Sequence, residues 1–342
     1  MADGDLPMGN PAHWPAELLP MLCRAITCEH ATVSRAGIPI TLPLTPYMGE
    51  DGRTLDVSTG LTYPAKAERV RRNPRVCMLF SDPVGSRLFD PPIILVYGLG
   101  AVRDRDLQSN ADRYLRLSMR KLPGLYHQLP WFVLRREHWY WTRIWIHTTP
   151  TRILWWPGGH TDEEPRRWDA PSSVSGGVSD PSPPGASPTA WKPGAADWRS
   201  RARYATRRLG LPVLTVMDGE GFPVPVRTQQ VEQTPGGFRL ALPGYLPAPV
   251  QGAACLTFHD HDERFAREEN ATFLGQVAMD GSRMASFDVD RVLGDLSAPG
   301  SWPRRVWSVV GARSRLRSRL DVELRRRGQP APVIRRAPLA QP

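Results

Sequence analysis

An internal repeat constrains this 342-residue chain more than any other feature, because one series of predicted strands occurs twice. Each copy has a strand, a glycine-containing turn and a strand interrupted by prolines, and two further strands follow. Repetition of a whole strand series predicts two units of one architecture in tandem. The corresponding segments are 31–43 with 214–226, 53–59 with 237–243, and 77–82 with 254–260.

The two copies differ in length. In the first, strands are predicted at about 30–35, 38–47, 53–59, 76–81, 93–103, 139–147 and 151–156, and helices at 14–28, 64–73 and 105–121. The second copy begins near residue 211 and closes with strands near 273–278 and 283–289. Where the first copy has the helix over 64–73, the second has only residues 244–251, so it lacks that helix and its basic residues.

A change of composition separates the copies. Residues 171–193 are rich in Ser, Gly and Pro and show no apolar periodicity, which is typical of a flexible linker. We therefore expect a first domain over 14–156, a linker over 157–197, a second domain over 198–296 and a basic amphipathic helix over 303–327. Residues 1–13 are expected to be a loose leader.

The helix over 64–73 carries the clearest chemical signal. The strand before it ends in Ser58-Thr59-Gly60, Pro64 opens the helix, and Lys66 lies in the first turn. A lysine is unfavourable at the positive end of a helix dipole unless an anion is also present. The free N–H groups of the first turn are suited to a phosphate. The alternative is a solvated basic helix whose lysine faces water.

Several segments of the first copy resemble the flavin-binding split-barrel family, which includes pyridoxamine-phosphate-oxidase-like proteins and deazaflavin-dependent reductases. The resemblance is carried by 31–39, 58–75 and 76–81, and residues 140–156 are similar to the closing strands of such barrels. It implies a mainly β fold with peripheral helices, built from two tandem split β-barrels. The first barrel has a complete cofactor-site helix and the second is degenerate.

Family members usually bind their cofactor where two barrels of a dimer meet. The resemblance therefore implies either a monomeric pseudo-dimer, in which one chain forms that interface, or a homodimer. Two independent barrels on one chain are the alternative. The residues that the resemblance assigns to cofactor binding are Ser58, Thr59, Thr62 and Lys66 at the phosphate, Arg69 as an added charge, and Thr45 in the strand beside the ring.

The resemblance also implies a function: an FMN- or F420-dependent oxidoreductase that transfers hydride between the cofactor and a small organic acceptor. The excess of arginine over lysine suggests a GC-rich genome, a background in which F420 is common, while haem is a third alternative. No catalytic residue is predicted, because such cofactors carry the hydride chemistry themselves. The sequence has neither a dinucleotide-binding GxGxxG motif nor a P-loop. A non-catalytic cofactor- or haem-binding sensor is the alternative.

The formal net charge of +10 leaves nucleic acid and anionic membranes open as partners. Arginines are dense over 303–327, and Leu316, Leu320 and Leu324 recur there at helical spacing. We expect this helix to pack on a barrel with its arginines in solvent. A charge-driven contact with nucleic acid or a membrane surface is the alternative. No signature of sequence-specific nucleic-acid binding accompanies it.

Cysteine usage and segment hydropathy bear on the compartment. Cys23, Cys28, Cys77 and Cys255 form no CxxC pair, which favours a reduced, cytoplasmic protein. No signal peptide and no transmembrane segment are predicted. The run 259–263, with two histidines and three carboxylates, is expected to be a polar loop; metal binding is the alternative, and no metal site is assigned.

Overall fold

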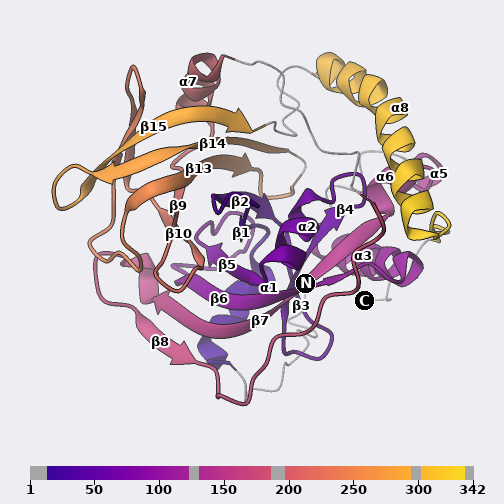
Figure 1. The fold of residues 1–342 in the computed structure, drawn as a ribbon, viewed down its shortest axis with the longest axis horizontal. Coiled ribbons are helices and arrows are strands. Elements are labelled where there is room, and N and C mark those ends of the chain that lie inside the picture. The colour runs from indigo at the N-terminus through magenta and orange to yellow at the C-terminus, as the bar shows by residue number, and fades with distance from the viewer. Residues whose placement is uncertain (1–13, 123–130, 186–196, 266, 294–301, 336–342) are drawn as a thin grey trace.

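Two curled antiparallel sheets make up most of the molecule (Figure 1). The computed structural model describes residues 14–122, 131–185, 197–265, 267–293 and 302–335, and for 302–312 the backbone only. None of the described helices is both long and apolar enough to span a membrane. The predicted leader, residues 1–13, lies outside the described residues.

Sheet A contains the strands of the first copy. In order of hydrogen-bonded neighbours they are β2 (Pro39–Leu44), β1 (Cys28–Val33), β5 (Arg75–Phe80), β6 (Ile93–Arg103), β7 (Arg143–Trp156), β4 (Leu55–Gly60) and β3 (Pro46–Met48), with β8 (Arg166–Asp169) paired to β7. Only Thr45 separates β2 from β3, although the two lie at opposite ends of this order. The sheet must therefore curl until its edges approach, which is the geometry of a barrel.

Sheet B repeats that order strand for strand. Its strands are β10 (Pro223–Arg227), β9 (Val213–Met217), β13 (Gln251–His261), β14 (Glu268–Met279), β15 (Met284–Leu293), β12 (Gly237–Ala241) and β11 (Gln230–Gln233). The edge strands β10 and β11 are again neighbours in sequence. The chain thus contains two tandem split barrels, as the repeat predicted.

Each barrel has a glycine at a β-bulge, and the two bulges occur in the equivalent pair of strands. The register of β6 with β7 shifts at Tyr97/Gly98, and that of β14 with β15 shifts at Leu274/Gly275. A Cβ on Gly98 would lie 2.8 Å from the carbonyl oxygen of Thr149, and one on Gly275 would lie 1.8 Å from that of Asp288. Only glycine allows so close an approach of two backbones.

The helices distinguish the copies. They are the 3-10 turn Ala16–Leu18, α1 (Leu19–Arg24), α2 (Ala65–Arg72), α3 (Leu107–Lys121), α5 (Trp131–Leu134), α6 (His138–Trp141), the 3-10 turn Pro157–Gly159, α7 (Trp198–Arg208) and α8 (Trp302–Arg327). In the first copy α2 connects β4 to β5, whereas the residues between β12 and β13 form no helix. The loss of this helix from the second copy is confirmed.

Alternating apolar side chains fill the first barrel. Leu55 and Val57, two residues apart on β4, are fully buried there. Ala67 and Val70, three residues apart on α2, pack into the same core, as expected for one face of a helix. The core side of α2 is thereby fixed, and its basic residues lie on the remaining faces.

The two barrels share a second apolar core at the seam between sheets A and B. Ala31 and Tyr97 of the first barrel are buried together with Val216 and Leu256 of the second. The ring of Tyr97 meets that of Phe222 edge to face, with the centroids 5.5 Å apart. The structure therefore shows one packed unit and not two independent barrels.

A buried ion cluster lies within this seam. We call Glu29, Ser81, Arg227 and His259 the Glu29 cluster. The Glu29 carboxylate is fully buried; it accepts hydrogen bonds from Ser81 Oγ at 3.0 Å and from the Arg227 guanidinium, and lies 2.8 Å from His259 Nε2. Burial alone would raise the pKa of Glu29, but the Arg227 charge and the His259 hydrogen bond lower it below its usual value.

A second polar contact crosses the seam beside this cluster. His261 Nε2 lies 3.3 Å from a carboxylate oxygen of Asp82 and 3.0 Å from Thr27 Oγ1. Burial opposes ionisation of both groups, yet their mutual hydrogen bond lowers the pKa of Asp82 to about 2 and raises that of His261. Both polar contacts join strands of the first barrel, or the loops next to them, to β10 and β13 of the second.

These contacts correct the expectation for 259–263. His259 and His261 belong to β13 and not to a polar loop, and both face the first barrel. A carboxylate of the other barrel is available to each, which accounts for the burial of two histidines at alternate positions. Among the described residues no group of three or more potential ligands is placed to hold one.

Three further expectations differ from the structure. The predicted strand over 38–47 is divided at Thr45 because its two halves pair at opposite sheet edges. The strands expected at 139–147 and 151–156 are one strand, β7, which passes Pro150 at the bulge and is preceded by α6. The linker expected over 157–197 contains β8, and further along Asp180 caps the backbone N–H groups of Asp104 and Arg105.

The C-terminal helix is as long as expected, but its arginines form ion pairs that were not expected. Leu316, Leu320 and Leu324 are buried, which confirms the predicted apolar stripe; the valines of 306–310 lie outside the described side chains. Arg313 pairs with Glu137, and other arginines of α8 also form ion pairs within the chain. The expectation that all its arginines face solvent is therefore wrong.

Replacing Glu29 tests the seam. Glu29→Gln should lower the free energy of unfolding by about 3 kcal/mol or more, because Arg227 would remain in the seam without its counter-charge. Urea denaturation measures this change. Glu232→Gln, at an exposed position of β11, is the control and should stay within about 0.5 kcal/mol of wild type. Equal effects of the two substitutions would contradict a stabilising seam.

The Asp82–His261 pair predicts a pH window. The pair stabilises the fold fully at pH values above the pKa of Asp82 in the unfolded chain, about 4, and below the pKa of His261 in the unfolded chain, about 6.5. It falls as pH drops towards 2 because Asp82 is protonated, and falls as pH rises through the raised pKa of His261 because that ring loses its charge. The difference in unfolding free energy between wild type and Asp82→Asn, measured from pH 3 to 9, should be largest inside this window. With the exposed Asp280→Asn the difference should be small and flat; a flat Asp82→Asn curve would refute the pairing.

Candidate anion-binding site

The first turn of α2 lies at the seam between the barrels. Lys66 and Arg69, three residues apart, lie on one side of the helix. Arg71 lies elsewhere on the helix and pairs with Asp104 at 2.9 Å. The two cations on the seam side are therefore separate from the structural ion pairs of the helix.

The Lys66 ammonium makes no hydrogen bond or ion pair with any described residue. It is half-buried, and its surroundings lower its pKa to about 8. Desolvation is the main cause, the charges of Arg69 and Arg143 add to it, and Glu268 opposes it. A cation that is partly desolvated and unpaired is stabilised when an anion binds beside it.

Arg69 connects the helix to the first strand of the barrel. Its Nε donates a hydrogen bond to Thr32 Oγ1 of β1 at 2.7 Å. Desolvation, with a contribution from Arg72, lowers its pKa to about 10, so it stays charged at neutral pH. Cys255 of the second barrel is also close enough to affect this pKa. Arg69 therefore marks where α2 meets β13.

Two buried polar groups near this turn have no hydrogen-bond partner among the described residues. They are Nε2 of His30, on the face of β1 that also carries Thr32, and Oγ1 of Thr62 before the helix. Burial and the charges of Arg69 and Lys66 lower the pKa of His30 to about 3, so its ring is neutral. Buried polar groups are seldom left unpaired in a folded protein. Together with the unpaired ammonium, they fit a ligand that brings an anion and further polar atoms.

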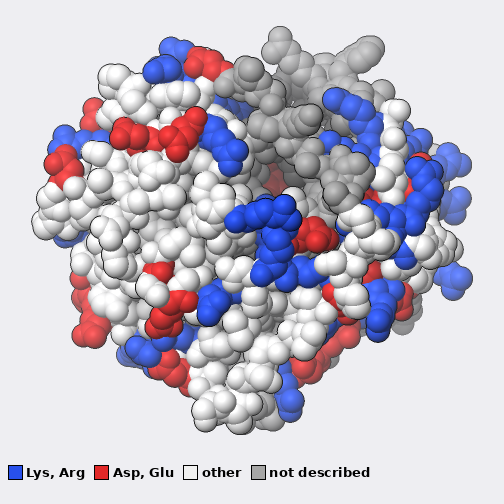
Figure 2. Space-filling view, viewed as in Figure 1, with Lys and Arg blue, Asp and Glu red and all other residues white. Residues whose placement is uncertain are grey.

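The second barrel forms the opposite wall. Glu268, the first residue of β14, is exposed to solvent, yet enough protein surrounds it that desolvation raises its pKa, against the charge of Lys66. Figure 2 shows a hollow in the middle of this face, with basic side chains at its edge and an acidic side chain inside. Glu268 and Lys66 form no ion pair among the described residues, although each charge affects the pKa of the other.

The predicted hydroxyl residues do not all reach this cleft. Ser58 and Thr59 are adjacent on β4 and point to opposite faces of the strand. Ser58 is paired with Trp145, two residues from Arg143, and so lies on the Arg143 face. Thr59 Oγ1 donates to the Tyr63 carbonyl at 3.2 Å and fixes the turn before α2.

Thr45 lies further along the sheet. It is the half-buried residue between β2 and β3, next to the Pro46–Val57 pair of β3 and β4. This register places it beside Ser58 and not beside Lys66. The structure thus brings Lys66, Arg69 and Thr62 to the helix turn, and places Ser58 and Thr45 along the neighbouring strands.

Sequence reasoning missed three residues of the cleft: His30, Arg143 and Glu268. His30 and Thr32 are two residues apart on a predicted strand and so lie on the same face of it. That His30 is near α2 could have been inferred once α2 was placed on that face. Arg143 lies in an aromatic-rich run and stacks over the Tyr114 ring at 4.0 Å. Glu268 has no sequence signal, because its position depends on how the two barrels pack.

A separate groove of about 640 Å³ lies elsewhere on the first barrel. Asp56, Arg113 and His147 line it, and so do five residues between 171 and 177 of the predicted linker. The Asp56 carboxylate accepts a hydrogen bond from Arg113 at 2.6 Å, which accounts for its burial. None of the predicted site residues lines this groove.

Comparison with known proteins gives matches among solved structures only. No protein-family model and no curated protein matches the chain. An F420 reductase is 24% identical, and the match covers 41% of this chain and 98% of that one with a TM-score of 0.31. A putative pyridoxamine 5'-phosphate oxidase from Listeria innocua is 20% identical over 40% and 93% of the chains, with a TM-score of 0.28.

A putative 5-nitroimidazole antibiotic resistance protein from Bacteroides thetaiotaomicron is 16% identical over 41% and 81% of the chains, with a TM-score of 0.28. Each match covers less than half of this chain. The first two carry names from the group that the sequence segments resemble. The description as tandem split barrels rests on the strand order and the meeting of the sheet edges described above.

Chemical labelling tests the state of Lys66. Near pH 8 about half of an amine with this pKa is deprotonated and reactive, so acetic anhydride should acetylate Lys66 readily. Millimolar inorganic phosphate should reduce that labelling several-fold, as measured by peptide mass spectrometry. Lys121 is the internal control: its pKa is also about 8, but its ammonium donates to the Pro46 carbonyl at 2.5 Å. Equal protection of both lysines, or of neither, would contradict an anion site at Lys66.

Proposed function

We propose that the chain binds one phosphate-bearing flavin-type cofactor, FMN or F420, in the cleft between its two barrels and acts as an oxidoreductase. The observation that carries this proposal is the Lys66 ammonium, which is partly desolvated, lies at a helix N-terminus and is unpaired in the described part of the chain. The resemblance of residues 58–75 to the split-barrel family supports a phosphate as the anion.

Each residue of the cleft has a distinct role in this proposal. Lys66 binds the cofactor phosphate, aided by the N–H groups of the first helical turn. Thr62 donates its unpaired hydroxyl, and Arg69 adds charge while its bond to Thr32 holds the helix against β1. Thr59 holds the turn from behind through the Tyr63 carbonyl.

The ring of the cofactor would lie along the strands that follow from the phosphate end. Ser58 and Thr45 line that direction, and neutral His30 offers a hydrogen-bonding nitrogen without adding a charge. A bound flavin or deazaflavin supplies hydride transfer, and the protein binds and orients it and limits access of water. A small organic molecule is the proposed hydride acceptor.

The second barrel supplies a wall of this site and no second site. Residues 242–250, between β12 and β13, form no helix and contain no lysine or arginine. Nothing there corresponds to Lys66 or Arg69. We therefore propose one cofactor per chain, with the seam inside the chain acting as a pseudo-dimer interface.

Substitution of Lys66 tests this function. Lys66→Ala should weaken binding of FMN or F420, whichever the wild type binds, by about 1.5–3 kcal/mol, because one charge-assisted hydrogen bond is lost. This corresponds to roughly ten- to hundredfold in dissociation constant. Fluorescence titration measures it. Arg291→Ala, an exposed cation on β15, is the matched control and should leave binding unchanged.

Three results would refute parts of the proposal. Wild-type affinity in Lys66→Ala would refute the phosphate assignment. Tight binding without any reduction of the bound cofactor by NAD(P)H or a reduced deazaflavin, and without its reoxidation by added acceptors, would leave a non-catalytic binding barrel and refute the oxidoreductase assignment. A stoichiometry near two cofactors per chain would refute the single site.

A further inference from the structure

Helix α2, which carries Lys66, is too short to hold its own orientation. It has eight residues, and isolated helices shorter than about 12 residues are marginal in water. Contacts with the rest of the chain must therefore fix the direction in which its first turn points. One such contact is the packing of Ala67 and Val70 in the barrel core, and another is the hydrogen bond from Arg69 to Thr32. A third contact involves parts of the chain outside the first barrel.

This third contact is a largely buried group of ion pairs. We call it the Asp104 cluster, and its members are Glu68, Arg71, Asp104, Glu323, Arg326 and Arg327. Asp104 Oδ2 accepts hydrogen bonds from Arg71 of α2 at 2.9 Å and from Arg327 of α8 at 3.1 and 3.2 Å. Arg327 also pairs with Glu323 and lies 4.0 Å from Glu68 of α2. The side chains of Asp104 and Arg327 are 4% and 3% exposed, so water hardly weakens their attraction.

The predicted linker and the residues after α8 meet at the same place. The Asp180 carbonyl accepts a hydrogen bond from Arg71, and Asp180 Oδ2 accepts one from the backbone N–H of Asp104 at 2.8 Å. Gln329 Nε2 donates to the Asp104 carbonyl at 3.0 Å. Three segments that are far apart in the sequence therefore hold Asp104, which in turn holds the last turn of α2.

The cluster is balanced in charge and separate from the anion site. It has three carboxylates and three guanidinium groups, and no described hydrogen bond or ion pair joins any of them to Lys66. Its members therefore do not compete with an anion for Lys66. Any influence of the whole cluster on the site must pass through the position of α2.

We propose that the Asp104 cluster positions α2 for anion binding, with Asp104 and Arg327 as positioning residues for the site at Lys66. This inference rests on the proposed function. With the cluster intact, the first turn of α2 is held in one orientation; without it, the helix keeps two contacts and samples others. If the binding orientation is then populated for about a fifth of the time, the apparent dissociation constant rises about fivefold. The C-terminal helix thus contributes to affinity without touching the ligand.

Two substitutions separate positioning from charge. Asp104→Asn removes a negative charge, so by charge alone it would strengthen the binding of an anion, whereas loss of positioning weakens it. Arg327→Lys keeps the positive charge, so by charge alone it would change nothing. However, an ammonium cannot replace a planar guanidinium that bonds to two carboxylates at once.

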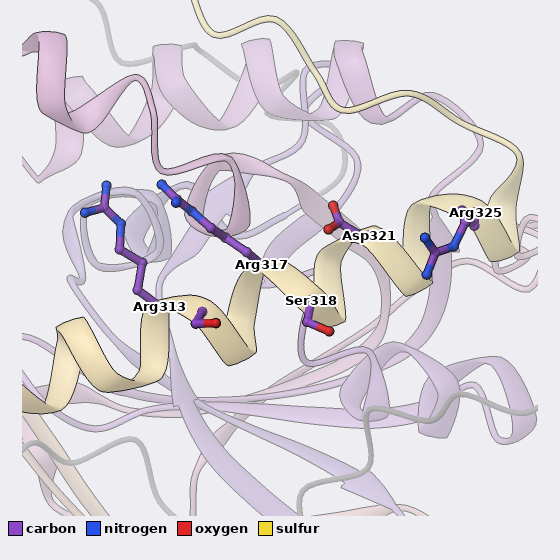
Figure 3. A pocket seen from close by; sticks show the side chains of 6 residues that line it. Arg313, Arg317, Ser318, Asp321 and Arg325 are labelled. Carbon is purple, nitrogen blue, oxygen red and sulfur yellow. The ribbon is translucent and has the colours of Figure 1, made fainter.

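The exposed side of α8 provides matched controls. Asp321 and Arg325 project there and do not belong to the cluster (Figure 3). Asp321→Asn and Arg325→Lys make the same two chemical changes at exposed positions, and both should leave the site unchanged.

The experiment uses inorganic phosphate as the probe of the site. For wild type and the four variants, all full-length, peptide mass spectrometry gives the phosphate concentration that halves acetylation of Lys66 near pH 8, after thermal melting has shown which proteins are folded. We expect this concentration to rise about fivefold in Asp104→Asn and by a smaller factor in Arg327→Lys, and to equal the wild-type value in both controls. If Asp104→Asn does not fold, Arg327→Lys decides the test.

The outcomes separate this inference from the proposed function. An unchanged or lower concentration in folded Asp104→Asn or in Arg327→Lys overturns the positioning role and leaves the anion site at Lys66 standing. An equal rise in the control variants also overturns it. If phosphate does not protect Lys66 in wild type, the anion site itself fails, and the proposed function fails with it.

Discussion

The structure depends on the packing of sheet A against sheet B along the seam. Apolar side chains of both barrels are buried together there, and burial of apolar surface is the main source of such stability. The Glu29 cluster makes this packing specific for one arrangement of the two barrels. A fully buried carboxylate is costly unless paired, so Glu29 holds Arg227 and His259 of the second barrel in one arrangement.

The same packing creates the electrostatics of the candidate site. The second barrel brings Glu268 close to the helix, and the Lys66 cation is partly desolvated but forms no ion pair among the described residues. A group in that state binds an anion more strongly than a surface lysine does. Stability of the seam and affinity of the site are therefore expected to vary together.

Local signals in the sequence were sufficient for the elements but not for their contacts. The helix predicted over 64–73 is found at Ala65–Arg72, because Pro64 and the Asn73-Pro74 pair mark its ends within the sequence itself. The common face of Lys66 and Arg69 follows from helical spacing alone. The run 259–263 was wrongly predicted as a loop because it is polar. Its histidines can be buried in a strand only because each is paired with a carboxylate of the other barrel. Glu268 was missed for the same reason.

The asymmetry of the seam gives a physical account of why one chain carries both barrels. The strand pairing places Val213 where the first barrel has Glu29, and Pro43 where the second has Arg227, which shifts the match of segments 31–43 and 214–226 by one residue. If two first barrels met in the same way, each Glu29 would face Pro43 and Ser81 in place of Arg227 and His259, and would be buried without a cation. Such a pairing is disfavoured by the cost of an unpaired buried charge. Because the two halves are covalently joined, they are free to diverge, one keeping the helix with Lys66 and the other supplying the histidines and arginine that hold it in place.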